Sequence, residues 1–345
     1  MSPIWVCPKC KGSLASAASD QLKCAMCSAS YEVIGGIPDL RIGPVPEWVD
    51  FEADLQLARE LSQRDLDLHG TVRTVYSSRP GWDEQRIDFR TRQVLEAPLR
   101  LRAETTGWLQ PILPDEGEFL DLGCGAGMLI AAAATRGKRG VGVDVSLAWL
   151  LVARKLISHY GGEPILAAAM AENLPLRDGE LASVISLDVI EHVENVPQYL
   201  KEIGRVVQVG GSIAISTPNR FSLTAEPHVF VWGVGWLPRR WQKGFVRWRS
   251  GKSYDDTRLL SSRDLHRYFR DNGAFDFELR IPDIQPENIR KFSRTKTAVA
   301  KLYNRFASVR ALRPFFLGIG PFFRVIGTKL PPFRSPIQSV AAERS

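Results

Sequence analysis

The sequence predicts an α/β protein with a doubly wound, mostly parallel sheet, and three observations support this prediction. An apolar strand that ends at Leu122 continues through a glycine-rich turn into the alanine-rich segment 128–134, which makes the first strand–turn–helix unit of such a sheet. Strand and helix patterns then alternate as far as residue 219. A length of 345 residues leaves room for additions on both sides of this domain.

Proline positions and shifts in composition divide the chain into four expected parts. Pro44 and Pro46 mark the end of a cysteine-rich N-terminal module. Leucines at helical spacing then predict a helical lead-in or cap before the α/β domain. The expected boundaries are 1–43 for the module, 44–115 for the lead-in, 116–280 for the α/β domain with an insertion at 221–255, and 281–345 for a basic, partly apolar C-terminal extension.

Four of the five cysteines form two Cys-x-x-Cys pairs, separated by 13 residues, in the N-terminal module. They are Cys7, Cys10, Cys24 and Cys27. This spacing predicts a structural, tetrahedral Zn²⁺ site of the zinc-ribbon type, because two tight turns each present two thiolates. Disulfides or a redox pair are the alternatives, and a reducing compartment argues against both.

Charge and hydropathy set expectations for location and partners. The N-terminus lacks a basic region followed by an apolar one, so no signal peptide is predicted and the expected location is the cytoplasm. The net charge of +7 is concentrated in residues 281–345, with 12 Lys and Arg against 3 Asp and Glu, which favours a nucleic acid or a membrane surface as partner. The apolar run 315–323 is far shorter than the roughly 20 residues that span a bilayer. It fits a peripheral element on the inner membrane face, a segment packed on the protein, or a dimer contact.

Two acids mark the expected ligand site. Asp121 lies inside the glycine turn, before Gly123, Gly125 and Gly127, where a carboxylate disfavours a pyrophosphate and favours an ammonium group or an ordered water. Asp144 ends the next strand, 23 positions later, where an acid accepts hydrogen bonds from ribose hydroxyls. Val145 would form an apolar wall beside the base. An ordinary helix-capping role of Asp144 is the alternative.

Five sequence blocks in order identify a family resemblance. They are Asp-Leu-Gly-Cys-Gly-Ala-Gly, Gly-Val-Asp-Val-Ser, Ala-Glu-Asn-Leu-Pro-Leu, Asp-Val-Ile-Glu-His-Val and Leu-Lys-Glu-Ile-Gly-Arg-Val-Val-Gln-Val-Gly-Gly. A glycine turn alone is weak evidence, but the ordered set over 118–219 resembles class I S-adenosylmethionine-dependent methyltransferases. The resemblance implies a Rossmann-like methyltransferase sheet. The segment 7–40 also resembles zinc-ribbon modules found in front of bacterial methyltransferases.

The resemblance implies a set of cofactor residues. Asp121 and the glycine loop would hold the amino-acid end, Asp144 the ribose and Val145 the adenine. Ala171 would offer a backbone amide to the adenine edge with Glu172 nearby, and Asp188 would lie by the sulfonium. Met170 departs from the family pattern, because many members carry an acid there and a thioether accepts hydrogen bonds only weakly.

The segment after the fourth strand carries the catalytic candidates. His192 is the candidate general base, because the unperturbed imidazole pKa lies near neutrality, and Glu191 is the second candidate. Asp188, Glu191 and His192 are spaced to share one helical face if this segment forms a turn. Some quinone-type O-methyltransferases of the family carry a similar Glu-His arrangement that can hold a divalent cation. A structural or orienting role for this pair is the alternative.

The expected activity is methyl transfer from S-adenosylmethionine to oxygen or carbon of a small-molecule, lipid-linked or glycan-linked acceptor. The insertion 221–255, in which tryptophans alternate with arginines, would cover the acceptor. One alternative is an RNA methyltransferase that binds RNA through the zinc ribbon and the basic tail, which steeply salt-dependent RNA binding would support. Another is a non-catalytic zinc-ribbon binding protein. Asp121 and the later blocks disfavour a nicotinamide enzyme.

Overall fold

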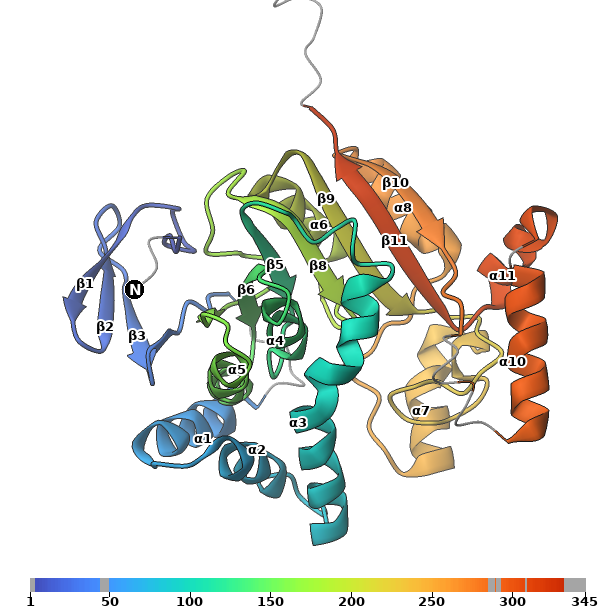
Figure 1. The fold of residues 1–345 in the computed structure, drawn as a ribbon, viewed down its shortest axis with the longest axis horizontal. Coiled ribbons are helices and arrows are strands. Elements are labelled where there is room, and N and C mark those ends of the chain that lie inside the picture. The colour runs from blue at the N-terminus through green and yellow to red at the C-terminus, as the bar shows by residue number, and fades with distance from the viewer. Residues whose placement is uncertain (1–3, 44–49, 285–288, 290–292, 308, 332–345) are drawn as a thin grey trace, which may run out of the picture.

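A seven-stranded mixed sheet forms the centre of the protein in the computed structural model, which describes residues 4–43, 50–284, 289, 293–307 and 309–331 (Figure 1). The strand order is β10-β11-β9-β8-β5-β6-β7. The strands are β5 (Glu118–Leu122), β6 (Arg139–Asp144), β7 (Ile165–Ala168), β8 (Leu181–Leu187), β9 (Val207–Pro218), β10 (Phe275–Arg280) and β11 (Phe322–Lys329). The five strands from β9 to β7 run parallel, as the sequence predicts for a doubly wound sheet.

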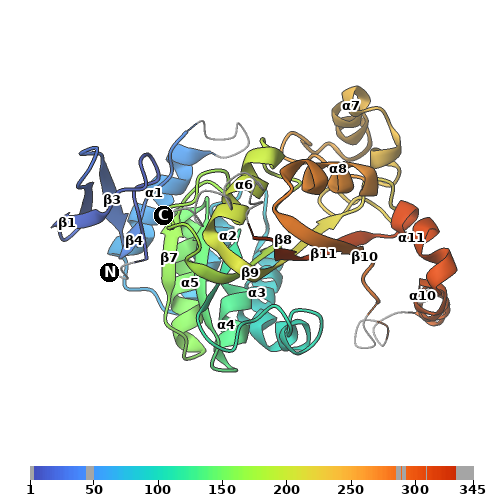
Figure 2. The ribbon, with the colours of Figure 1, turned by 90° about the horizontal axis from the view of Figure 1, so that it is seen from above.

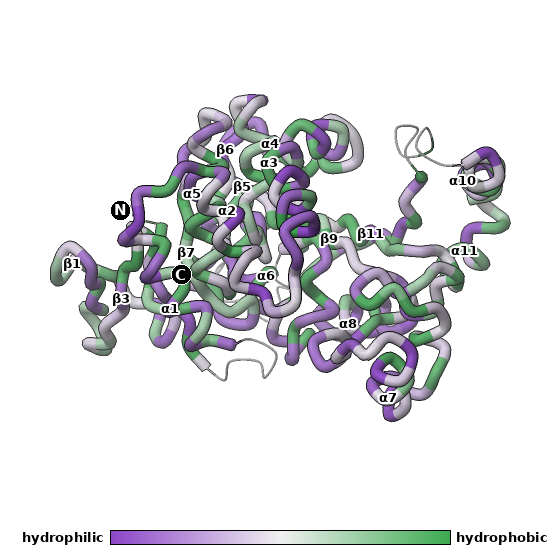
Figure 3. The backbone as a smooth tube through the Cα atoms, turned by 90° about the horizontal axis from the view of Figure 1, so that it is seen from below, coloured by the Kyte–Doolittle hydropathy of each residue, from purple (hydrophilic) through white to green (hydrophobic). Residues whose placement is uncertain are grey.

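Helices cover both faces of this sheet. Figure 2 shows α3 (Glu84–Thr106), α4 (Met128–Ala134) and α5 (Leu147–His159) on one face and α6 (Val196–Val206) and α8 (Ser262–Asn272) on the other. Because both faces are covered, the central strands are mainly apolar, and Phe119 and Leu120 of β5 are fully buried. In Figure 3 the hydrophobic segments gather around α4, α5 and β7. The sheet therefore forms the core between two helical layers.

The cysteine module is a small antiparallel sheet at one edge of the molecule, blue in Figure 1. Its strands are β1 (Leu14–Ala18), β2 (Gln21–Cys24), β3 (Ser30–Ile34) and β4 (Ile37–Pro38). The module joins the edge strand β7, because Asp39 forms a parallel bridge with Ala168, and Trp5 pairs with Leu176. It is thus packed on the α/β domain and does not stand apart from it.

The lead-in is helical, with α1 (Phe51–Gln63), α2 (Leu68–Ser77) and α3. Each helix begins at an aspartate whose carboxylate accepts a backbone N–H of the first turn, namely Asp50, Asp67 and Asp83. Both α1 and α2 pack on α5. Since α5 follows the Asp144 loop, the lead-in lies next to the expected ligand site.

The insertion after β9 contains η1 (Val234–Trp236) and α7 (Arg239–Ser250) and has a small core of its own. Its core residues are Val229, Val231, Val234, Val246 and Tyr254. Four tryptophans of this region are largely exposed: Trp232, Trp236, Trp241 and Trp248. Residues Arg239 and Lys243 of α7 face a cavity described below.

The sheet does not end at residue 280, where the expected domain boundary lies. The C-terminal segment adds α10 (Arg294–Ala307), η2 (Arg310–Leu312), α11 (Arg313–Ile319) and then β11, which pairs antiparallel with both β9 and β10. Without β11 the strand β10 would have no partner, and β9 would leave an unpaired edge. The run 315–323 is therefore divided: Phe323 is fully buried in β11, whereas Phe315 on α11 is 60% exposed.

Several basic residues of the tail contact the protein itself. Arg313 donates to Glu278 and to the Leu279 carbonyl oxygen, and Arg324 pairs with Glu104 at 3.2 Å. Lys329 Nζ donates to the Val207 carbonyl oxygen at 2.7 Å. The rest of the predicted basic tail, 332–345, lies outside the described residues. Over the described ranges, every helix is too short or too polar to cross a membrane.

Candidate active site

A cavity of about 280 Å³ lies at the carboxyl ends of the parallel strands, where open α/β sheets bind ligands. Six of the residues predicted to hold the cofactor line it: Gly123, Asp144, Val145, Ala171, Glu172 and Asp188. Met170, the departure from the family pattern, also lines it. The cavity is mainly apolar with a few polar groups, as expected for a nucleoside site.

The glycine turn has a backbone that other residues would strain. Gly123, Gly125 and Gly127 have φ values of 79°, 49° and 70°. A Cβ at Gly123 would lie 2.3 Å from Val189 Cγ2, and one at Gly127 would lie 2.8 Å from Ala153 Cβ. At Gly125 a Cβ would meet open space, and neither Gly125 nor Gly127 lines the cavity. The first and third glycines therefore permit close packing, whereas the middle one is favoured only by its positive φ.

Asp144 organises the turn from the end of β6. Its carboxylate accepts from Gly125 N at 2.8 Å and from Ser146 N at 2.9 Å. Burial raises its pKa, although these two hydrogen bonds oppose the shift. A carboxylate has about four acceptor positions, so two remain for the hydroxyls of a ribose. The residue therefore fits both the predicted ribose role and a structural one.

Asp121 is a buried carboxyl with no hydrogen-bond or ion-pair partner among the described residues, and it is only 4% exposed. Burial, together with the charge of Asp144, raises the pKa of Asp121 to about 8. A cationic ligand group nearby would stabilise the carboxylate form. This unsatisfied acid fits the ammonium group of the cofactor implied by the resemblance.

Glu172 lines the cavity, and its carboxylate also accepts backbone hydrogen bonds. Its Oε1 accepts from Glu194 N at 3.0 Å and from Asn195 N at 3.3 Å. These bonds fix the start of the segment that leads into α6. One carboxylate oxygen is thus already engaged in holding the fold beside the adenine end of the expected cofactor.

The segment after β8 forms a turn, but the side chains of its two acids, Asp188 and Glu191, have different hydrogen-bond partners. Asp188 has a φ of 57° and its Oδ1 accepts from Ser216 Oγ at 2.8 Å. Glu191 and His192 lie instead with His228, with ligand atoms of all three within 4.8 Å of one another. Asp188 lies outside this close group, but its charge contributes to raising the pKa of Glu191, and it lines the first cavity together with His192.

His228 is a site residue that the sequence analysis missed. Its Nδ1 hydrogen-bonds Glu226 Oε1 at 2.5 Å, and its Nε2 lies 3.9 Å from Glu191 Oε1. The ring meets His192 edge-on, with centroids 4.9 Å apart. His228 comes from the insertion, and no spacing relates it to the turn after β8. Only its proximity to Glu226 in the sequence could have drawn attention to it.

A second cavity, of about 270 Å³, lies between this turn and α7. Its lining includes Glu191, His192, Arg239 and Tyr254. His192 also lines the first cavity. This histidine therefore stands where the two cavities meet, which is where a donor and an acceptor would meet.

The hydrogen bonds of His192 and Glu191 define their protonation. His192 Nδ1 lies 2.5 Å from the Asp256 carbonyl oxygen, so it must donate, and the neutral ring carries its lone pair on Nε2. Burial lowers the pKa of His192, only partly opposed by this hydrogen bond. Burial, with the charge of Asp188, raises the pKa of Glu191 to about 8. At neutral pH, His192 is therefore a neutral base beside a largely protonated Glu191.

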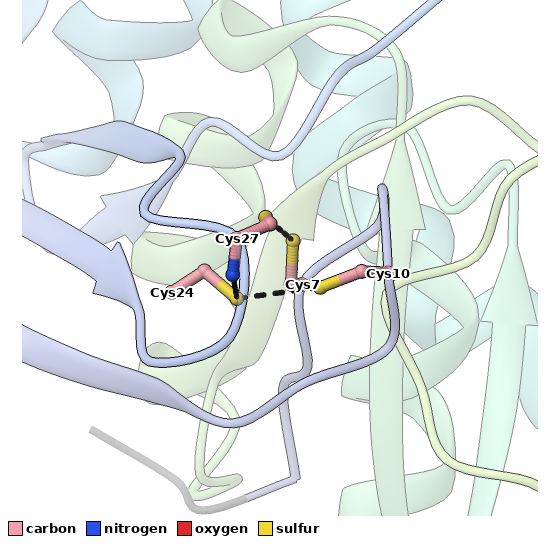
Figure 4. Close-up of side chains that lie close together, drawn as sticks. All are labelled: Cys7, Cys10, Cys24 and Cys27. Atoms are coloured by element: carbon pink, nitrogen blue, oxygen red, sulfur yellow. Dashed lines mark hydrogen bonds between the residues drawn. The ribbon is translucent and has the colours of Figure 1, made fainter.

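The four N-terminal cysteines converge, as Figure 4 shows, with their sulfur atoms turned toward a common centre. All four sulfurs lie within 4.8 Å of one another, and the Cys7–Cys27 and Cys10–Cys24 pairs are separated by 3.7 and 3.4 Å. Zn–S bonds of about 2.3 Å in a tetrahedron place sulfurs about 3.8 Å apart. The four thiols are free of disulfides. The donor set therefore fits a tetrahedral Zn²⁺ ion.

The known proteins that this chain resembles are methyltransferases. A family profile described as "Methyltransferase domain" matches residues 120–215. The "Ubiquinone biosynthesis O-methyltransferase" of Dinoroseobacter shibae is 32% identical over 52% of this chain and 70% of that protein. The protein of the same name from Azorhizobium caulinodans is 34% identical over 36% of this chain, which spans about half, 51%, of that relative's length. A solved S-adenosylmethionine-dependent methyltransferase from Mesorhizobium loti is 18% identical over 64% of this chain and 95% of that chain, with a TM-score of 0.45.

The fold is that of an α/β protein with a cavity at the carboxyl ends of its parallel strands. The chain belongs to the class I S-adenosylmethionine-dependent methyltransferases. The family resemblance expected from the five sequence blocks is therefore confirmed.

Proposed function

We propose that the protein transfers the methyl group of S-adenosylmethionine to an oxygen atom of a small-molecule acceptor. The observation that carries this proposal is that His192 lines both cavities. The relatives named as O-methyltransferases support oxygen over carbon as the acceptor atom. An assay for S-adenosylhomocysteine release with a panel of phenolic and aliphatic hydroxyl compounds tests it, and release with none of them would remove it.

Residues of the first cavity, together with Asp121, which does not line it, would hold the cofactor. Asp121 would face the ammonium group, Asp144 the ribose hydroxyls, and Val145 and Ala171 the adenine. The bound cofactor supplies an electrophilic methyl group on a sulfonium. The contribution of the protein is alignment of the acceptor with that methyl group and exclusion of water.

His192 would act as the general base for the acceptor hydroxyl. The cofactor would supply the methyl group to the acceptor oxygen, and Nε2 of His192 would take up the proton that this hydroxyl loses. The Asp256 carbonyl oxygen fixes the ring in the tautomer that can accept this proton. Glu191, neutral and held by Thr217 Oγ1 at 2.9 Å, would be a polar neighbour and not a second base.

The His192→Gln variant is expected to lose about 10²- to 10⁴-fold in kcat/KM for the acceptor, the typical contribution of a positioned base. Its affinity for S-adenosylmethionine should change little. In the wild type, kcat/KM should rise with pH through a pKa below 6.5 and stay level near pH 7, because burial favours the neutral imidazole. The variant should lack this rise. The measurement is the pH profile of both proteins.

The matched control is His266→Gln. Like His192, His266 forms a hydrogen bond between its Nδ1 and a backbone carbonyl oxygen, that of Ser262, at 2.8 Å. It lies on α8, however, and its side chain is exposed. This variant should retain wild-type activity and the wild-type pH profile. A His192→Gln protein with wild-type kcat/KM would rule out the base role.

A divalent cation at Glu191, His192 and His228 is a second candidate role for this cluster. It is favoured by the proximity of the three ligand atoms and by Glu191 Oε1, a buried oxygen that accepts no hydrogen bond. The same assay separates the two roles. Activity that survives chelation supports the base, and activity lost to a chelator and restored by a divalent ion supports the cation.

We also propose that Cys7, Cys10, Cys24 and Cys27 hold a structural Zn²⁺ ion. The support is the convergence of four thiol sulfurs at distances near those of a tetrahedral site. All four coordination positions would be filled by cysteines, so this metal would have no open position for a substrate. Its removal is considered in the Discussion.

A lipid-linked acceptor, presented at a membrane surface, is a narrower proposal. Exposed aromatic residues support it: Trp248 on α7 is 78% exposed and Phe315 on α11 is 60% exposed. Arginines Arg247 and Arg249 flank Trp248 and would favour anionic lipid. We expect the protein to sediment with anionic vesicles, less so at high salt. Equal recovery in the supernatant with and without vesicles would exclude it.

A further inference from the structure

We propose that the cysteine module and Arg41 position the cofactor site, so that the affinity for S-adenosylmethionine depends on their contacts. This inference rests on the proposed function, in that it needs the first cavity to bind this cofactor. Two loops line that cavity, the loop after β6 at 144–146 and the loop after β7 at 169–172. Both receive hydrogen bonds from the N-terminal part of the chain.

The loop after β7 is held from the module itself. Leu40 N donates to the Ala168 carbonyl oxygen at 2.8 Å, immediately before the lining residues begin. Val6 N donates to the Pro175 carbonyl oxygen at 2.9 Å, on the far side of the same loop. Lys11 Nζ donates to the Leu174 carbonyl oxygen at 2.9 Å. The loop is thus fixed at both ends by the segments that carry the cysteines.

The loop after β6 is held through Arg41, whose side chain is only 1% exposed. Its guanidinium makes a two-pronged contact with Asp39, with both distances 2.7 Å. It also donates to Asp54 at 3.0 Å and to the Val145 carbonyl oxygen at 2.9 Å. A planar guanidinium with five donors can satisfy these acceptors at once, and a lysine cannot. Arg41 therefore connects the end of the module, helix α1 and the cavity wall.

Asp54 extends this contact to the first turn of α5. Its carboxylate accepts from Ser146 Oγ at 2.5 Å, from Leu147 N at 2.9 Å and from Ala148 N at 3.3 Å. Ser146 lines the cavity, and Asp144 lies two residues before it. A carboxylate supplied by α1 thus caps α5 from outside, and Arg41 holds that carboxylate in place.

These contacts would couple the module to the cofactor cavity, so that their loss would lower the affinity for S-adenosylmethionine. The position of the Asp144 carboxylate relative to a ribose depends on the backbone from Asp144 to Ser146. Arg41 and Asp54 hold that backbone, and neither lines the cavity. Both are therefore positioning residues. Couplings between distinct sites typically change an affinity about 5- to 150-fold, which sets the size of the expected effect.

The test is calorimetric titration of the full-length zinc-loaded protein with S-adenosylmethionine. We expect Arg41→Met to raise Kd about tenfold. Arg41→Lys should raise it about threefold, because lysine keeps the positive charge but cannot donate to Asp39, Asp54 and the Val145 carbonyl oxygen at once. The binding stoichiometry should stay near one site per chain. A merely structural role would instead lower the stoichiometry, through loss of folded protein, and leave Kd unchanged.

The matched control is Arg59→Met. Arg59 on α1 pairs with Glu32 on β3 at 2.8 Å, so it joins the module to α1 as Arg41 does, but at an exposed position away from both loops. Its loss should leave Kd within twofold of the wild type. An equal rise in Kd for Arg59→Met would overturn the specific role of Arg41.

The outcomes separate this inference from the proposed function. A wild-type protein that does not bind S-adenosylmethionine contradicts the proposed function and with it the inference. A wild-type protein that binds, together with an Arg41→Met protein whose Kd lies within twofold of it, overturns the inference alone. If Arg41→Met does not fold, the same twofold criterion is applied to Arg41→Lys.

Discussion

The Asp144→Ala variant is expected to lose almost all affinity for S-adenosylmethionine, with a rise in Kd of about 10²- to 10⁴-fold. Each hydrogen bond to a charged group contributes about 1.5–3 kcal/mol, and the alanine would remove two to the ribose hydroxyls. It would also remove the acceptor of Gly125 N and Ser146 N, which orders the glycine turn. Calorimetric titration with S-adenosylmethionine measures the loss.

The control for this experiment is Asp144→Asn, which keeps the size of the side chain and one acceptor oxygen. We expect its Kd to lie between those of the wild type and the alanine variant. Thermal unfolding of all three proteins without ligand shows whether they are folded. A folded Asp144→Ala protein with a Kd within threefold of the wild type would contradict the assignment of the ribose to this residue.

Removal of zinc is expected to unfold the cysteine module. The module has about 40 residues, too few to bury a core that is stable alone, and structural zinc in such modules contributes about 10–16 kcal/mol at pH 7. Cys24→Ser should therefore abolish stoichiometric zinc and expose the amides of 4–43 to hydrogen exchange. The α/β domain should keep its seven-stranded sheet, because these strands pair with one another. Exchange in this domain should rise mainly where module residues such as Trp5 and Leu40 share its core. The measurements are metal content and hydrogen exchange by segment.

The fifth cysteine provides the control for the zinc experiment. Cys124 lies in the glycine turn and is buried, far along the chain from the other four. Cys124→Ser should keep one zinc per chain and full protection of the module. Purified wild-type protein without zinc, in which the same amides are protected, would show that the cysteines serve another purpose.

The local features of the ligand site could be predicted from the sequence. The turn between β5 and α4 is predictable because three glycines at alternate positions directly follow an apolar strand, and all three have a positive φ. The parallel strands β5 to β9 are predictable because strand and helix patterns alternate along this part of the chain. Asp144 and Val145 could be placed on the cavity wall because ligands bind at the carboxyl ends of parallel strands, and these two residues lie at the end of β6.

Other features depend on contacts that leave no periodic signal. The expected boundary at residue 280 leaves out β11, because the run 315–323, which overlaps the start of this strand, equally fits an interfacial element, a packed segment or a dimer contact. The sequence cannot show that Asp188 has a positive φ and accepts a hydrogen bond from Ser216, which lies on β9. His228 was missed because the insertion that carries it folds back on the turn after β8.

The sequence by itself determined the family, the cofactor loop and the four-cysteine set, because each is encoded by residue types at short, fixed spacings. Tertiary structure decided which side chains meet across long separations. His192 lies between two cavities because α7 forms one wall of the second cavity. The loop after β6 is held by hydrogen bonds from Arg41, which also binds Asp54. Such contacts bring together elements tens of residues apart, where loop closure sets no preferred spacing for a sequence pattern to reveal.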